Sequence, residues 1–228
     1  MKILHGLLAL ACLGGQVPAY ADVVELALSN SSFSVQVSSL KERQFRHTIR
    51  QKYDFSCGSA ALATLLTHHY RFPASEQDVF TSMYQTGDKA QIQRLGFSMA
   101  DMKQYLGRQG FEADGYSLSL DAFAELGVPA IALININGYN HFVVIKGVRG
   151  DSVLVGDPAL GIRAFSRSAF EGMWTKVVLL VLDHKDVASP TYNRPADWNI
   201  VEKAPLDEAL YREAFNSWVL MMRGPNDF

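Results

Sequence analysis

The sequence predicts an α+β fold in which a helical N-terminal part is followed by an antiparallel sheet. Two observations support this order. Between residues 57 and 126, strong helix formers and capping residues favour four helices, whereas short β-branched runs separated by turns dominate residues 130–182. The chain of 228 residues is long enough for a sizeable core, and 21 basic against 23 acidic residues give no general nucleic-acid footprint.

Residues 1–21 have the pattern of a secretory signal. Lys2 provides a positive start, residues 3–13 an apolar core, and Ala19-Tyr20-Ala21 a small-x-small cleavage site. The apolar run is about half of the roughly 20 residues that a membrane-spanning helix needs. We therefore expect a periplasmic protein without a stable transmembrane anchor after cleavage.

Composition divides the rest of the chain into four parts. We expect an N-terminal strand or extension over residues 22–39, a single main domain over 40–182, an extended surface linker over 183–205 and an amphipathic helix over 206–228. Packing of this last helix on the domain or on a second copy is favoured over a membrane or secretion-partner site, because apolar stripes usually face protein.

The expected elements follow from helix formers, caps and turn residues. A basic, polar stretch over 40–50 is expected to be either solvated surface or the rim of a cleft, and residues 87–89 and Gly96 to be loops. Helices are predicted over 57–70, 75–85, 99–108, 120–126 and 168–173, and strands over 32–37, 130–136, 141–147, 151–157, 162–165 and 176–182.

Cys57 is the candidate nucleophile. It lies where a loop turns into a helix, with Ser56 or Asp54 as the expected N-cap. The unpaired N–H groups of a first helical turn stabilise an anion, and the thiolate is the nucleophilic form of cysteine. A buried structural cysteine is the common alternative. Because Cys12 leaves with the signal, however, Cys57 is the odd cysteine of an exported chain, which suggests a reactive thiol or an intermolecular pair.

His141 and Asp157 are the candidate partners of this thiol. They lie on two β-branched strands joined by a turn at residues 147–151. If this hairpin is symmetric about Arg149, the two side chains are cross-strand neighbours on one face, with Cβ atoms about 5 Å apart. The carboxylate then orients the imidazole, which takes the proton from Cys57. Taken singly, a strand histidine or an Asp-Pro turn is more often structural than catalytic.

The other histidines fit this role less well. His68 and His69 lie on the same helix as Cys57, roughly 16 to 18 Å along its axis, whereas His47 and His184 are not excluded by position. With one cysteine in the mature chain and no histidine pair at ligand spacing, no metal site is expected. The sequence also has no glycine loop that would cradle a phosphate, so no cofactor is expected.

Three stretches together resemble the bacteriocin-processing, or double-glycine, peptidase family of papain-like cysteine peptidases. They are Gln51-x5-Cys57-Gly58-x-Ala60-Ala61-Leu62, Gly138-Tyr139-x-His141-Phe142-Val143-Val144 and Asp157-Pro158-Ala159-x-Gly161. The match covers residues 40–182 and is similar to the stand-alone exported branch. The resemblance implies a papain-like fold with Cys57 as nucleophile, His141 as general base and acid, Asp157 as the orienting group and Gln51 as an oxyanion-hole donor.

The resemblance further implies an exported endopeptidase that cleaves after small residues, such as a Gly-Gly pair in a leader or linker. The expected partners are a peptide or protein substrate and proteins of a peptide or functional-amyloid secretion system. Two alternatives remain. The same triad would serve an amidase or acyltransferase, because an amine or water can resolve a thioester. A non-catalytic adaptor would only bind peptide in the cleft.

Overall fold

The computed structural model describes residues 23–28, 31–36, 40–53 and 55–202. The predicted signal over 1–21 and the predicted helix over 206–228 lie outside these residues. The chain forms two units that divide after Ser39. In the first, β1 (Val23–Leu28) pairs with β2 (Ser31–Gln36) as an antiparallel hairpin.

The second unit is built on a six-stranded sheet whose neighbouring strands are all antiparallel, in the order β3-β8-β4-β5-β6-β7. Its central strands are almost continuous apolar runs because both faces are covered. The strands are β3 (Ala113–Ser117), β4 (Ala130–Ile136), β5 (Tyr139–Arg149), β6 (Ser152–Asp157), β7 (Gly161–Ser166) and β8 (Trp174–Val181).

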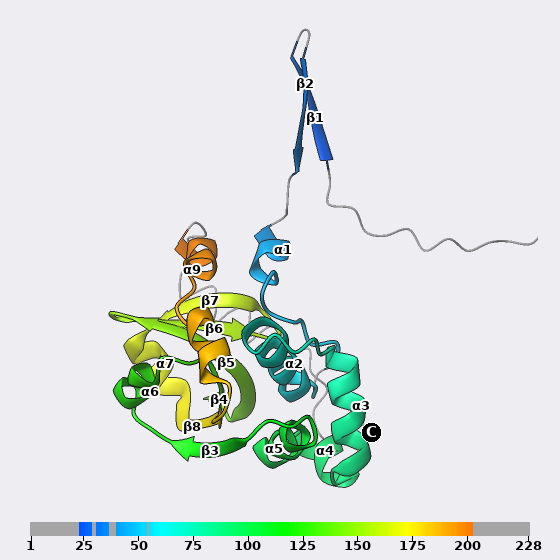
Figure 1. The fold of residues 1–228 in the computed structure, drawn as a ribbon, viewed down its shortest axis with the longest axis vertical. Helices are drawn as coiled ribbons and strands as arrows, with labels where there is room; N and C mark the ends of the chain where they lie inside the picture. The colour runs from blue at the N-terminus through cyan, green and yellow to red at the C-terminus, as the bar shows by residue number, and fades with distance from the viewer. Residues whose placement is uncertain (1–22, 29–30, 37–39, 54, 203–228) are drawn as a thin grey trace, which may run out of the picture. The chain divides into compact units, whose positions relative to one another are not determined.

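Helix α2 (Cys57–His69) lies between β5 and α3 and is buried along nearly its whole length (Figure 1). Such a helix needs apolar residues on every side, which explains its run of alanines and leucines. The other helices are α1 (Leu40–Gln44), α3 (Glu76–Thr86), α4 (Lys89–Leu95), α5 (Met99–Arg108), α6 (Leu120–Leu126), α7 (Arg167–Met173), α8 (Lys185–Ala188) and α9 (Pro195–Glu202), with a 3-10 turn, η1, at Ser189–Thr191.

The helices lie on both sides of the sheet. In Figure 1, α3, α4 and α5 gather beyond α2, and α6 and α7 lie at the opposite side of the sheet. Helix α9 packs on β7 and α1. Among the helices of the described residues, none combines the length and the apolar character needed to cross a membrane.

The predicted helices and strands of the main domain are found, and three further elements are not among the predictions. Residues 89–95 form α4, which is capped by Asp88 and lies between the expected loops at residues 87–89 and Gly96. Residues 40–44 form α1 within the polar stretch, and residues 113–117 form the edge strand β3. β3 has no apolar alternation and exists because it pairs with β8, which is a tertiary contact that the local sequence does not reveal.

The expected extended linker over 183–205 is not found over residues 183–202. This segment instead forms α8, η1 and α9. Trp198 and Asp197 of α9 are buried, and Trp198 packs with Leu154 and Ile162. The proline- and asparagine-rich composition marks the ends of these short helices rather than an extended chain.

Candidate active site

Cys57 is the first residue of α2, at the end of the loop that the sequence predicted. Its side chain is buried, with 7% of its surface exposed. The next residue is Gly58. A larger residue would be crowded at this position, because an added Cβ would lie 3.2 Å from both Met102 and Phe97. The thiol is therefore fixed between a helix start and packed side chains.

The predicted N-cap of α2 is only partly correct. Ser56 occupies the N-cap position, but its side chain does not cap the helix. Its hydroxyl, which has one hydrogen to donate, lies instead within hydrogen-bond distance of both the Glu76 carboxylate and the carbonyl of Tyr53. The first-turn N–H groups of α2 thus receive no side-chain cap from Ser56 and are available to an anion at Cys57.

Glu76 fastens the loop in front of Cys57. It is the first residue of α3, is 3% exposed, and accepts hydrogen bonds from the Lys52 N–H at 2.9 Å and from the Ser56 hydroxyl. Glu76 is not among the site residues that the sequence predicts. The available signal is an acidic residue directly after the helix cap Ser75, but such residues are usually solvated.

His141 and Asp157 lie together, both buried. His141 Nε2 donates to Asp157 Oδ1 at 2.9 Å. The predicted register was wrong, however. Val148 pairs with Val153 and Val144 with Gly156, so His141 is a diagonal neighbour of Asp157 and not the residue directly opposite. The two side chains share a face and meet because an imidazole is long enough to reach a diagonal neighbour.

The charges at this pair are strongly coupled. Burial disfavours a charged imidazole, but the Asp157 carboxylate, its hydrogen bond and the Cys57 thiol together raise the pKa of His141 to about 10. Burial likewise disfavours a charged carboxyl, but His141 and the N–H groups of Ala159 and Leu160 lower the pKa of Asp157. With Nε2 held by Asp157, the ring nitrogen left for the Cys57 thiol is Nδ1.

Asp157 also builds the turn that follows β6. Its Oδ1 accepts from the N–H groups of Ala159 at 2.8 Å and Leu160 at 3.3 Å. Asp157 thus makes both the contacts of a turn residue and the hydrogen bond to His141. The turn ends at Gly161, which has φ +83° and where a Cβ would lie 2.8 Å from the side chain of Gln44.

Gln51 lies beside this turn. Its backbone N–H donates to the carbonyl of Pro158 at 2.9 Å, which holds the chain in front of Cys57 against the end of β6. Its side-chain Nε2 donates to the carbonyl of Tyr53 at 3.1 Å. A primary amide has two N–H donors, and this bond engages one of them.

The remaining histidines have other environments. His69 Nδ1 hydrogen-bonds the Thr191 hydroxyl at 2.7 Å, and His47 Nδ1 pairs with Asp197 Oδ1 at 2.6 Å. Burial is the first cause that lowers the pKa of His68, to about 4. Across the described part of the chain, no group of three or more His, Cys, Asp or Glu side chains is arranged to hold a metal ion.

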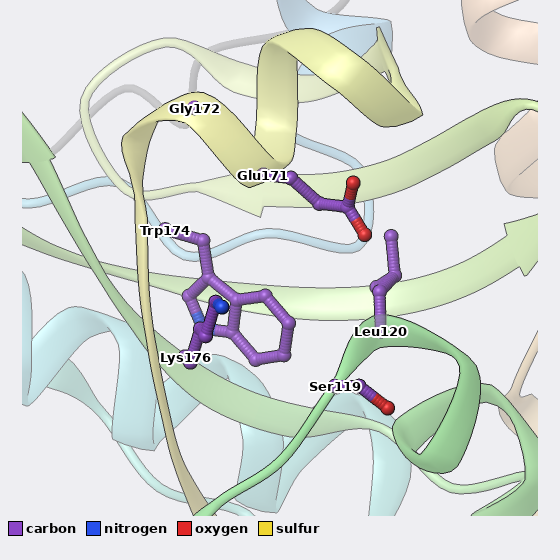
Figure 2. Close-up of a pocket in the computed structure, with 6 residues that line it drawn as sticks. All are labelled: Ser119, Leu120, Glu171, Gly172, Trp174 and Lys176. Carbon is purple, nitrogen blue, oxygen red and sulfur yellow. The ribbon is translucent and has the colours of Figure 1, made fainter.

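The pockets of the described surface include the following two. One of about 420 Å³ lies between α6 and α7, where the Glu171 side chain extends toward Leu120 (Figure 2); it is lined by Ser119, Leu120, Glu171, Gly172, Trp174 and Lys176. The other, of about 550 Å³, is lined by residues on either side of Gln51, namely Arg50 and Lys52, and by Glu76. Of the polar stretch 40–50, Ile49 and Arg50 line this hollow.

Comparison with known proteins places this chain among peptidases. The model of the Peptidase C39 family matches residues 46–186. The chain is 43% identical over 147 residues to the probable functional amyloid protease FapD of Pseudomonas aeruginosa, covering 64% of this chain and 65% of FapD, just under two thirds of its length. It is 27% identical over 143 residues to the lactococcin-G-processing and transport ATP-binding protein LagD of Lactococcus lactis, covering 58% of this chain and 18% of LagD.

Two solved structures share the fold. The peptidase domain of Streptococcus ComA is 20% identical, with a TM-score of 0.52, covering 59% of this chain and 96% of that domain. A double glycine motif protease from an AMS/PCAT transporter, solved with its leader peptide, is 27% identical, with a TM-score of 0.50, covering 58% of this chain and 88% of that one. The predicted α+β fold, with helices followed by an antiparallel sheet, is confirmed.

Proposed function

Because the chain belongs to the Peptidase C39 family, we propose that it is a cysteine endopeptidase that cleaves after small residues, with Cys57, His141, Asp157 and Gln51 as its active site. The observation that carries the proposal is the buried His141–Asp157 pair, joined at 2.9 Å and in contact with the thiol at the start of α2. A purely binding protein has no chemical need for this arrangement.

In the proposed reaction, the Cys57 thiol has given its proton to His141, and the resulting thiolate attacks the carbonyl carbon of the scissile peptide bond. The resulting oxyanion receives hydrogen bonds from the free Nε2–H of Gln51 and from the backbone N–H of Cys57; one such donor is worth about 3 kcal/mol of the barrier. With its pKa raised to about 10, His141 carries a proton at neutral pH. It gives this proton to the leaving amine, and later takes one from the water that hydrolyses the thioester.

The proposed substrate is a protein with a Gly-Gly type leader or linker. Support comes from the double glycine motif protease solved with its leader peptide, at 27% identity. The name of FapD suggests that the substrate is a component of a functional-amyloid or peptide secretion system. Residues 1–21 support export to the periplasm on their sequence pattern alone.

The test is cleavage of a peptide with one Gly-Gly pair, followed by mass spectrometry of the products. We expect two fragments and their free termini from the wild type, and none from Cys57→Ala. A matched peptide with Val-Val in place of Gly-Gly should resist cleavage. Unchanged proteolysis by Cys57→Ala would refute the assignment.

The same assay separates the two alternatives. A product in which an added amine replaces water would identify an acyltransferase, and release of ammonia alone would identify an amidase. Peptide binding without cleavage, with Cys57 alkylated by iodoacetamide at the same rate in wild type and His141→Ala, would favour the adaptor. We expect the His141 variant to be alkylated more slowly at neutral pH.

A further inference from the structure

A single extra residue in β5 decides which face of the sheet His141 occupies. On β5 and β6, Gly147 pairs with Leu154 and Ile145 pairs with Val155, so Lys146 has no partner in the ladder and forms a β-bulge. If Lys146 were paired instead, β5 would move by one residue against β6. Because side chains alternate between faces, His141 would then lie on the face opposite to Asp157.

Lys146 is held in this bulge by buried polar contacts. Its side chain is fully buried inside an apolar strand. Its Nζ donates to the carbonyl of His47 at 2.6 Å and forms an ion pair with Asp197 Oδ2 at 3.1 Å. Its stem crosses β6 at Gly156, where a Cβ would lie 3.0 Å from Lys146 Cδ. The glycine makes room for the lysine.

The segment that supplies Asp197 also binds the bulge backbone. The N–H of Asn193 donates to the carbonyl of Lys146 at 2.9 Å, and the Asn193 side chain donates to the carbonyl of Val148 at 3.0 Å. These bonds satisfy groups on β5 on either side of Gly147. At Gly147 a Cβ would lie 2.2 Å from Asn193 Oδ1, so the close approach requires glycine.

The energetic consequence is a strong preference for one register. A buried ammonium is stable only with its partners, and removing one partner of a buried ion pair is strongly destabilising. The partners His47 and Asp197 are reached from the bulge. A slip of β5 that paired Lys146 in the ladder would withdraw its Nζ from both, so this buried charge opposes the slip.

We propose that Lys146 and Asp197 are positioning residues, which hold the bulge in β5 and thereby keep His141 on the same face as Asp157. The inference rests on the proposed function for its catalytic consequence, but not for its geometry. Asp197 and Asn193 lie beyond residues 46–186, to which the family model matches. A segment outside the family match therefore sets the geometry of the proposed site.

The experiment is a ¹³C-edited NMR titration of the His141 imidazole in the whole chain, under reducing conditions, in wild type, Lys146→Met and Asp197→Asn. We expect the midpoint of His141 to fall from about 10 toward the ordinary value of 6.5 in both variants. We also expect kcat for the Gly-Gly peptide to fall about 100-fold, as for a misplaced catalytic group, with KM little changed. Lower melting temperatures with the His141 midpoint unchanged would overturn the proposal.

Deletion of Lys146 is the matched control. It removes the buried charge and the extra residue together, and leaves Ile145 and Gly147 in a regular ladder with their present partners. His141 should then keep its high midpoint, which a general loss of stability would not explain. If the deletion variant does not fold, the His141 titration of Asp197→Asn tests the proposal, because this substitution retains every backbone atom. The titration needs no substrate, so a wild type that cleaves nothing would refute the proposed function and leave this inference standing.

Discussion

Asp157 combines two roles at one oxygen atom. Its Oδ1 accepts from His141 and from the N–H groups of the following turn. A side chain that is fixed by its own backbone loses little conformational entropy when it orients a partner. This explains how a diagonal cross-strand pair, with a longer reach than a direct one, is still held at hydrogen-bond distance.

We predict that Asp157→Asn lowers the pKa of His141 from about 10 toward 6.5. Asparagine keeps the oxygen that accepts from the turn, but it removes the negative charge that stabilises the imidazolium. Peptide turnover should fall by roughly 10²- to 10⁴-fold, the usual contribution of acid–base catalysis. An NMR titration of the imidazole and initial rates at neutral pH measure the two effects.

Asp151→Asn is the control for this substitution. Asp151 lies in the exposed turn at the other end of the same hairpin. Both the His141 titration and the rate should be unchanged in this variant. A His141 midpoint that stays near 10 in Asp157→Asn would contradict the assigned cause of the shift.

At the scale of elements, α2 and α3 are joined through the loop that delivers Cys57. Glu76 accepts from the Lys52 N–H and the Ser56 hydroxyl, so the start of α3 holds the residues just before the start of α2. The position of the thiol therefore depends on a helix that contributes no group to the proposed chemistry.

We predict that Glu76→Ala destabilises the protein by about 1–3 kcal/mol, because it removes the acceptor of the part-buried Lys52 N–H and of the buried Ser56 hydroxyl. Glu76→Gln is the matched variant, since its amide oxygen can accept the same bonds. Urea denaturation measures the difference between them, and the alkylation rate of Cys57 reports the position of the thiol. Equal stability of the alanine and glutamine variants would contradict this account.

The same scale shows what the sequence could and could not predict. Helix α2 and strands β4 to β8 follow from helix formers, caps and β-branched runs, which are local signals. The register of β5 on β6 does not, because the bulge at Lys146 is held by Asp197 and Asn193, some 50 residues later. A lysine inside a β-branched run was the available sign, but its meaning depends on a buried partner that only the fold provides.

For the site residues, too, the residue identities could be predicted from the sequence, whereas some of their contacts depend on the fold. Cys57, His141 and Asp157 were identified from residue types and from the family resemblance, and the structure brings His141 to Asp157 and to the thiol. Gln51 lies beside the Asp157 turn, although its amide bonds the carbonyl of Tyr53. The predicted side-chain cap by Ser56 failed because a buried carboxylate from another helix competes for its hydroxyl.

At the scale of the molecule, the dependence of stability on pH is set by histidines whose pKa values are shifted in opposite directions. The pKa of His68 is lowered by burial to about 4 and that of His69 is lowered well below 6.5, whereas that of His141 is raised to about 10. Below 6.5 the unfolded chain binds more protons at His68 and His69, so stability rises with pH. Above 6.5 the folded chain binds more at His141, so stability falls.

We therefore predict that the free energy of unfolding is greatest near pH 6.5. Its decline above this value should approach roughly 1.4 kcal/mol per pH unit at most. The decline should be confined to pH 6.5–8, because the pKa of Lys146 is lowered, first by burial, to about 8 and its effect has the opposite sign above that. Urea denaturation across pH 4–9 tests this. His141→Gln should abolish the decline, and its persistence there would contradict the assignment to His141.

The contacts of α9 mean that the family boundary and the boundary of the cooperative folding unit are not the same. The family match ends at residue 186, whereas Lys146 finds its counter-ion at residue 197 and Leu154 its apolar cover at residue 198. If this peptidase were cut at residue 186 and grafted onto another protein, the buried Lys146 ammonium would lack its Asp197 counter-ion. The portable module must therefore extend through Trp198.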